Sequence, residues 1–476
     1  MIAARTPEQT RRRDLRTTRL PNAPTWSKGW TAISDAVARL GRANVAMHRF
    51  EVRFGALVEV DPLAWISAQP AGTRLYWADR DHTLEVAGVG VADRVEAPPA
   101  EADTALNALS SWLRHGGTQA RYFGHLTFGD TRAHAECGPN NADGAGDAED
   151  AAAGLRLTLP RVEVGRDTDG AWLAVHVIDG RPPVDLGATP GMASLAAQSP
   201  EIVSRSCEPA HAGWCASVTQ ALEAIDSAKL RKVVLARAST LVTATPVEPT
   251  ALLGRVAARD PSTFRFLLEH GPGDAFVGAS PERLYRRDGR RVECDALAGT
   301  RPRGMDRTLD DQLAAELLGS AKDRAEQAVV TEAITALLTP LGPGPVTTEA
   351  PTVRRFAHVQ HLWSPIRATL GASTEDGTLL TALHPTPAVC GTPTREARAM
   401  LSTLEHFPRV HYAAPLGWIG ASGAEFAVGL RAVRIRGHRL TLFAGAGIVS
   451  GSVPEAEWDE LDAKDFGTLA ALGATL

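Results

Sequence analysis

The chain of 476 residues is 44% hydrophobic and carries a formal net charge of −5 at pH 7. A chain of this length and composition can bury a large core and can hold two or three structural units. The mildly acidic charge argues against a nucleic-acid-binding protein and against binding to an anionic membrane surface. No apolar run approaches the roughly 20 residues that span a bilayer, so we expect no membrane association.

The five cysteines lie far apart, and none forms a CxxC pair. Their odd number and their scatter argue against a disulfide framework or a cysteine zinc site, and favour a reduced, cytoplasmic protein. Three consecutive arginines begin at Arg11, but no apolar segment follows, so no secretory signal is predicted. We expect residues 1–28 to be a disordered basic tail rather than an organellar transit peptide, because Glu8 and Asp14 interrupt the basic run.

Residues 29–205 give mixed signals and are expected to form a variable first half of the fold. Apolar content typical of strands occurs in six stretches, namely 43–59, 74–77, 82–91, 121–128, 155–164 and 171–177. Residues 103–114 are typical of a helix. The stretch 138–154 is acidic and poor in apolar residues, which predicts a flexible surface insertion.

The signals are sharper in residues 206–476. Helices are predicted at 214–225, 249–259, 309–318, 321–338, 394–404 and 454–472. Strands are predicted at 264–269, 275–278, 359–370, 417–419, 425–435 and 439–444. Helices and strands are interleaved, but the hairpin-like spacing favours antiparallel pairing. These patterns predict an α+β fold.

Lys232 stands at the entrance of an unbroken apolar run, Val233 to Ala236, which predicts a buried strand. A lysine beside such a run either extends its ammonium to water or stays partly desolvated, where the neutral form is favoured. The second alternative would make Lys232 a candidate general base. This stretch alone does not decide between them.

Four carboxylates could carry chemistry. Glu282 follows an apolar strand, where an exposed turn residue is the usual outcome and a partly buried acid with a raised pKa is the rarer one. Glu326 lies in a charged helical stretch, while Glu457 and Glu460 share one helical face. A solvated surface is the default for these three. Carboxylates from two helices could instead hold Mg²⁺.

Other residues are ambiguous when taken one at a time. Gly299 and Gly447 permit close approach of the backbone to an anion, although turn geometry explains them equally well. Ala388 ends a rigid two-proline segment that suits the wall of a pocket. His361 and Arg431 are single polar residues in apolar strands, and each is more often structural than ligating.

Together these residues fall in eight ordered blocks that resemble the chorismate-utilising enzymes, which include isochorismate, salicylate, anthranilate and aminodeoxychorismate synthases. The blocks are KVVLAR (232–237), GASPERL (278–284), ALAGTRPRG (296–304), SAKDRAEQ (320–327), HLWSPI (361–366), HPTPAVCGTP (384–393), FAGAGIV (443–449) and PEAEWDELDAK (454–464). The resemblance implies a large chorismate-binding fold of antiparallel sheets packed together, with helices on the outside. Residues 206–476 would form its catalytic region.

Three positions separate the reactions within this family. The ammonia-using enzymes typically have glutamine at the position of Lys232, so lysine resembles the water-using isochorismate and salicylate synthases. Aminodeoxychorismate synthases carry a nucleophilic lysine in the block where this chain has Ala298. Salicylate synthases usually replace the HPTPA block at 384–388. The resemblance therefore implies a Mg²⁺-dependent isochorismate synthase, an isomerase, with a salicylate synthase or a chorismate-binding protein without catalysis as alternatives.

The resemblance also implies a role for each residue. Lys232 would take a proton from the water that attacks C2 of chorismate, and Glu282 would protonate the departing 4-hydroxyl. Glu326 and Glu460 would hold Mg²⁺ on the ring carboxylate, with Glu457 reaching it through water. The substrate-binding set would comprise Ala298, Gly299, Thr300, His361, Ala388, Tyr412, Arg431, Gly447 and Lys464.

Two departures from the family pattern stand out. Asp295 replaces a glutamate that relatives often have, and Val410-His411 occupies the place where a glycine often precedes the tyrosine. Neither affects the acid–base pair. We expect a monomer without an amidotransferase subunit, and we favour menaquinone over siderophore biosynthesis because the chain has the long first half of many such enzymes.

Overall fold

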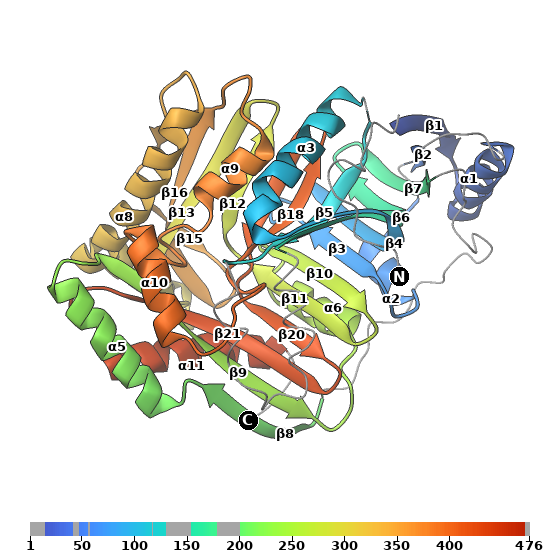
Figure 1. Ribbon diagram of the computed structural model, residues 1–476. Helices are drawn as coiled ribbons and strands as arrows, with labels where there is room; N and C mark the ends of the chain where they lie inside the picture. The colour runs from blue at the N-terminus through green and yellow to red at the C-terminus, as the bar shows by residue number, and fades with distance from the viewer. Residues whose placement is uncertain are drawn as a thin grey trace.

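The computed structural model describes residues 15–40, 47–55, 58–116, 118–129, 154–178 and 200–471. Two antiparallel sheets share a strand and pack together, with helices on their outer faces (Figure 1). The α+β fold with antiparallel sheets is therefore confirmed. In the described part of the chain, no helix is long and apolar enough to cross a membrane.

The first sheet is built around the strand of Lys232. Its order is β8–β9–β21–β20–β11–β10–β3–β4–β6–β7–β2–β1, and every pair is antiparallel except β1–β2. The strands are β8 (Ile202–Glu208), β9 (Lys232–Thr243), β21 (Arg439–Ile448), β20 (Ala432–Arg436), β11 (Asp274–Ser280), β10 (Phe264–Gly271), β3 (Arg74–Ala78), β4 (Leu84–Ala97), β6 (Leu155–Asp167), β7 (Gly170–Ile178), β2 (Met47–Phe54) and β1 (Leu15–Ala23).

The second sheet continues from β6, whose first residues pair with β5 while its last residues pair with β7. Its order is β6–β5–β18–β19–β12–β13–β16, with β14 and β15 both paired to β16. The strands are β5 (Arg121–Leu126), β18 (Pro415–Gly420), β19 (Gly423–Val428), β12 (Arg283–Asp288), β13 (Arg291–Pro302), β16 (Val359–Thr369), β14 (Thr347–Thr348) and β15 (Thr352–Arg355). The short β17 (Gly391–Thr392) pairs with the start of β9.

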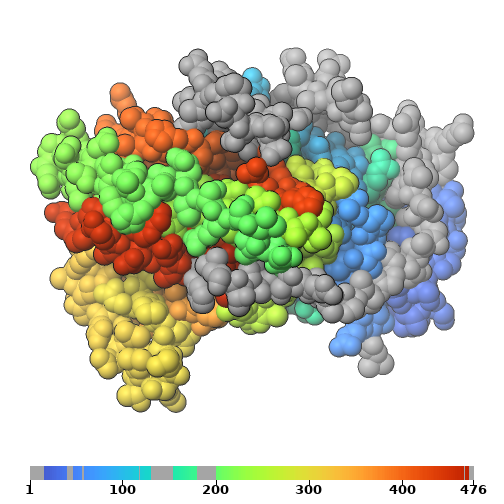
Figure 2. Space-filling model, turned by 90° about the horizontal axis from the view of Figure 1, so that it is seen from below, coloured from blue at the N-terminus to red at the C-terminus, as the bar shows by residue number. Residues whose placement is uncertain are grey.

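The helices cover the outer faces of both sheets. They are α1 (Trp26–Leu40), α2 (Pro62–Ser67), α3 (Ala102–His115), α5 (His211–Asp226), α6 (Pro249–Arg259), α7 (Arg307–Gly319), α8 (Ala321–Leu338), α9 (Asp376–Leu383), α10 (Thr394–Leu404) and α11 (Pro454–Ala471), with 3₁₀ turns at Pro99–Glu101 and Thr339–Leu341. Helices α5 and α11 lie side by side along one face of the molecule (Figure 2).

Three apolar clusters hold these layers together. One packs α3, α5, α8, α9 and α10 against both sheets, and a second packs α1, α2 and α6 against the first sheet. The third lies between the sheets and is rich in aromatic rings, including Trp77, Phe123, Trp172, Phe264 and Phe266. Large aromatic side chains suit this interface because each removes much apolar area from water.

The expectation of a disordered tail is wrong for residues 15–28. Leu15–Ala23 forms the edge strand β1, and α1 buries Trp30, Ile33 and Val37 against the sheet. A strand at a sheet edge obtains its hydrogen bonds from its neighbour, here β2, and the polar sequence of β1 does not show this. Residues 1–14 lie outside the described residues, as does nearly all of the insertion predicted at 138–154.

A second correction concerns the single strand predicted at 425–435. The structure divides it into β19 and β20, which belong to different sheets. Between them Arg431 adopts a φ of 48°. A non-glycine residue in this left-handed region is uncommon and ends regular pairing, although the apolar alternation continues through it.

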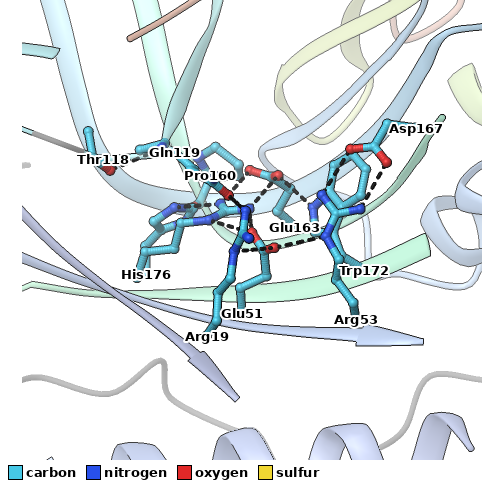
Figure 3. Close-up of polar contacts among 12 residues, drawn as sticks. Arg19, Glu51, Arg53, Thr118, Gln119, Pro160, Glu163, Asp167, Trp172 and His176 are labelled. Atoms are coloured by element: carbon cyan, nitrogen blue, oxygen red, sulfur yellow. Dashed lines mark hydrogen bonds and ion pairs between the residues drawn. The ribbon is translucent and has the colours of Figure 1, made fainter. Parts of the chain in front are cut away.

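A buried ionic network joins β2, β6 and β7 in the first half of the fold. Arg49 donates hydrogen bonds to Glu51 at 2.9 Å and to Glu163 at 3.2 Å, and Trp172 Nε1 donates to Glu163 at 2.9 Å. Figure 3 shows Glu51, Glu163, Trp172 and His176 turned toward one another. Burial disfavours the charged form of Glu163, but the Arg49 guanidinium outweighs it and holds the pKa at about 2.

Candidate active site

Lys232 begins β9 and is only 2% exposed. Its backbone lies between β17 on one side and β21 on the other, since Thr392 pairs with Lys232 itself and Ile448 pairs with Val233. The ammonium does not extend to water. Lys232 Nζ donates a hydrogen bond at 2.7 Å to Glu326 Oε1, which projects from α8. Lys232 is therefore buried, and its ammonium is paired with a carboxylate rather than with water.

Gly447 on β21 allows this ion pair to form. A Cβ atom at this position would lie 3.0 Å from Lys232 Cε and 3.1 Å from Glu326 Oε1. Contacts this short force one partner to move. Gly447 is thus part of the site. The groups that lie close to its backbone are the side chains of Lys232 and Glu326.

Glu282 lies in the turn between β11 and β12 and is 4% exposed. Its backbone N–H donates to Ser280 Oγ at 3.3 Å, which fixes the turn. Burial, aided by the negative charge of Asp295, raises the pKa of the Glu282 carboxyl to about 8, although Lys232 and Arg80 act in the opposite direction. Glu282 is therefore a buried acid that is largely protonated at neutral pH, and not an exposed turn residue.

Of two neighbours of Glu282, Arg80 was not singled out from the sequence, and Asp295 was noted only as a departure from the family pattern. Arg80, in the turn between β3 and β4, donates to the Pro281 carbonyl at 2.9 Å and forms an ion pair with Asp295 on β13. Burial disfavours the charge of Asp295, but the Arg80 guanidinium holds its pKa below the ordinary value. The only sequence signal was the charged run at 79–81 in the variable half of the chain. The ionised Asp295 in turn keeps Glu282 neutral.

Four predicted substrate-binding residues meet at one point. His361 Nδ1 lies 3.0 Å from Thr300 Oγ1 and 3.1 Å from the Gly299 carbonyl, and Arg431 donates to His361 Nε2 at 2.9 Å. Because Nε2 accepts from Arg431, the proton belongs on Nδ1, where it is donated to Gly299. Burial and the Arg431 charge lower the pKa of His361 to about 3, so the ring is neutral. Ala298, which precedes Gly299 on β13, is buried beside them.

Arg431 combines an unusual backbone with a desolvated charge. Its φ of 48° turns the chain between β19 and β20, and its guanidinium lies 5.5 Å from the Phe356 ring centre. Burial lowers the pKa of Arg431 to about 10, with Asp260 partly compensating at 4.0 Å. A half-buried guanidinium whose nearest carboxylate among the described residues is this distant is suited to an anionic ligand.

Tyr412 and Lys464 converge on Gly445 of β21. Lys464 Nζ donates to the Gly445 carbonyl at 2.7 Å, and a Cβ at Gly445 would lie 2.7 Å from the Tyr412 hydroxyl. Burial raises the pKa of Tyr412, with nearby Glu282 adding to the effect. Ala388 is half-buried and packs against the main apolar cluster, which also contains Ala298 and Tyr412.

The three predicted metal ligands lie at the starts of α8 and α11. Lys464 pairs with Glu460 at 2.7 Å, and Lys322 acts on both Glu457 and Glu460. Burial raises the pKa of Glu457. It also disfavours the charge of Glu460, but Lys464 and Lys322 hold the pKa of Glu460 below its ordinary value. Within the described residues, the three carboxylates do not gather within 4.8 Å of one another.

This donor set nevertheless suits Mg²⁺. All the available ligand atoms are carboxylate oxygens, which Mg²⁺ prefers, and this ion needs only one or two protein carboxylates because it keeps water or substrate oxygens. Glu326 and Glu460 already hold one lysine ammonium each at 2.7 Å, so both face positive charge in the structure.

Comparisons with known proteins agree with this arrangement. A family model described as chorismate binding enzyme matches residues 54–473. The isochorismate synthase MenF of Escherichia coli is 30% identical over 450 residues, which cover 92% of this chain and 97% of that protein. The chloroplastic isochorismate synthase 2 of Arabidopsis thaliana is 40% identical over 266 residues, or 55% of this chain. Since that match covers 47% of the plant protein, the chain spans about half of its length.

The solved structure of the menaquinone-specific isochorismate synthase from Escherichia coli superposes with a TM-score of 0.79 at 27% identity. The superposition covers 94% of this chain and 99% of that one. The family match includes every predicted site residue from Lys232 to Lys464 and leaves out β1 and α1. The chain therefore belongs to the chorismate-binding enzyme family.

Proposed function

We propose that this protein is an isochorismate synthase, an isomerase that converts chorismate reversibly to isochorismate. The observation that carries the proposal is the relation between Lys232 and Glu282. Both are buried and Lys232 acts electrostatically on Glu282, yet within the described residues Lys232 pairs with Glu326 and not with Glu282. A direct ion pair between them would ionise Glu282, which could then not donate a proton.

The reaction follows from these two groups. Lys232 removes a proton from the water molecule that attacks C2 of chorismate, in the neutral form that a Mg²⁺ ion on Glu326 would favour by taking the place of the lysine ammonium there. Glu282, protonated as its pKa of about 8 requires, donates its proton to the hydroxyl that leaves C4, so water is released as water is added. After the forward reaction Lys232 carries a proton and Glu282 has lost one. Lys232 can then act as the acid and Glu282 as the base, so the same pair catalyses the reverse reaction.

The remaining residues bind and orient the substrate. Arg431, with its orientation set by neutral His361, offers charge-assisted hydrogen bonds to the carboxylate of the enolpyruvyl group. The loop at Gly299 and Thr300 fixes His361 in turn. A Mg²⁺ ion, held by Glu326 and Glu460 with Glu457 reaching it through water, would supply positive charge for the ring carboxylate.

The direct test is incubation with chorismate and Mg²⁺, followed by chromatography of the products. We expect isochorismate, formed reversibly and without added ammonia or an amidotransferase subunit. Anthranilate as the main product, or salicylate with stoichiometric pyruvate, would overturn the proposal. Undiminished turnover in excess chelator would show that the reaction does not need Mg²⁺.

Lys232→Ala should lower turnover by roughly 10²–10⁴-fold, the usual contribution of a general base. Lys229→Ala is the matched control, because Lys229 is an exposed lysine three residues earlier and should behave as the wild type. Chorismate binding should weaken less than turnover in Lys232→Ala, since Arg431 remains. Near-normal turnover of Lys232→Ala would contradict the assigned role.

We further propose a role in menaquinone biosynthesis, as a cytoplasmic monomer. The support for the pathway is the match to the solved menaquinone-specific isochorismate synthase, which covers 94% of this chain. The mass in solution, and complementation of a strain that lacks its menaquinone-specific isochorismate synthase, would test the two statements.

A further inference from the structure

Three histidines from distant parts of the chain meet outside the site described above. His125 lies on β5, His270 on β10, and His411 in the segment between α10 and β18. One ring nitrogen of each lies within 4.8 Å of those of the other two. His125 and His411 are buried and His270 is half-buried. We call these three residues the histidine cluster.

The rings of His270 and His411 are nearly parallel, with planes inclined at 26°, while the ring of His125 is turned across that of His411. The ring centres of His125 and His411 are 4.3 Å apart with planes inclined at 63°, while His270 lies 5.8 Å and 6.1 Å from the two. Phe276 stacks on His411 at 5.1 Å and fixes its plane. The Nε2 atoms of His270 and His411 are buried and have no hydrogen-bond partner among the described residues. Buried polar atoms without partners are rare in folded proteins and indicate a missing ligand or ion.

Two of the three imidazoles, His270 and His411, are held in the neutral form, which is the form that binds metal. Burial lowers the pKa of His270 and of His411 well below the ordinary value, with the neighbouring histidines and Arg156 and Arg434 adding to the effect. These arginines are themselves paired, Arg156 with Glu96 at 2.8 Å and Arg434 with Asp274.

The position of the cluster suggests what an ion there would do. β5 belongs to the second sheet and β10 to the first, and His411 immediately precedes Tyr412 of the candidate active site. A bound ion would therefore join the two sheets and fix the segment that carries Tyr412.

We propose that His125, His270 and His411 bind a transition-metal ion such as Zn²⁺ through three imidazole nitrogens, separately from the Mg²⁺ carboxylates. Imidazole nitrogen suits Zn²⁺, Co²⁺, Ni²⁺ or Cu²⁺ and not Mg²⁺, and three histidines with a water molecule complete a tetrahedral Zn²⁺ site. Zn–N bonds of about 2.0–2.1 Å place such nitrogens about 3.4 Å apart. A bound ion would draw the three nitrogens, which lie within 4.8 Å of one another, to that spacing.

The test uses Co²⁺ as the probe on the full-length protein, after removal of metals with a chelator and dialysis. We expect one equivalent of Co²⁺ to give the intense visible absorption of a tetrahedral complex, to be displaced by one equivalent of Zn²⁺, and to be unaffected by excess Mg²⁺. Zn²⁺ should also raise the melting temperature. Neither readout needs chorismate, so the result does not depend on the proposed function.

Matched variants locate the ion. His270→Gln keeps the side-chain size at a half-buried position and should weaken Co²⁺ binding at least 10²-fold, whereas His438→Gln, at an exposed turn, should bind as the wild type. Equal Co²⁺ binding by His270→Gln and the wild type, or no absorption in the visible region, would overturn the proposal. If His270→Gln fails to fold, His411→Asn replaces it under the same criteria.

Discussion

Replacing Glu282 with glutamine tests the raised pKa of this carboxyl through protein stability, which can be measured apart from turnover. Glutamine keeps the size of the protonated acid but cannot ionise. In the folded protein, burial and Asp295 raise the pKa of Glu282 from 4.5 to about 8. Between these two pH values the native state holds a proton that the unfolded state has released, so the free energy of unfolding of the wild type must fall as pH rises. In Glu282→Gln, position 282 contributes no such decrease in the free energy of unfolding.

The size of the effect follows from the shift. The penalty is nearly absent below pH 4.5 and complete above about pH 8, and each pH unit between them corresponds to about 1.4 kcal/mol. From pH 5 to pH 8 the wild type should therefore lose about 3.5 kcal/mol relative to Glu282→Gln. With an unfolding entropy of about 2.1 cal/mol/K per residue, a chain of 476 residues changes its melting temperature by about 3–4 °C.

The assay is a series of melting curves for both proteins from pH 5 to pH 8 at one scan rate. Glu332→Gln, which removes an exposed glutamate from α8, is the control and should follow the wild type. Glu282→Gln should also lower turnover by roughly 10²–10⁴-fold. Wild-type turnover should decline as pH rises through about 8, because the proton donor ionises there. Parallel melting profiles of the wild type and Glu282→Gln would refute the raised pKa.

Three further substitutions test other parts of the structure. Arg431→Lys replaces a planar fork by a point charge and should raise KM for chorismate about tenfold or more in steady-state kinetics; an unchanged KM would argue against the carboxylate contact. Gly447→Ala places a methyl group 3.0 Å from Lys232 Cε and should reduce turnover while the melting temperature changes little, so full activity would show that the ion pair can move freely. Arg49→Met leaves Glu163 buried without its main cation and should destabilise the fold by about 3–5 kcal/mol in denaturant titrations. Adding Glu163→Gln should recover much of that loss, and a failure to recover it would mean that packing around Arg49 matters more than charge.

The elements that the sequence alone determined are those whose signals are local. Helices α6 and α10 begin and end where the pattern predicts, since their apolar spacing and the prolines at or before their first residues act over a single turn. The short, closely spaced strands also indicated antiparallel pairing. The ordered motifs identified the family before any geometry was known, because each block combines several specific residues.

The tertiary structure decided the relations between distant residues. It paired Lys232 with Glu326, placed the Arg80–Asp295 pair beside Glu282, added β1 to the sheet edge and brought the histidine cluster together. The sequence around these residues does not identify their partners. The charge that a buried side chain carries depends on the desolvation and the charges imposed by whatever packs against it, and those partners come from other strands and helices.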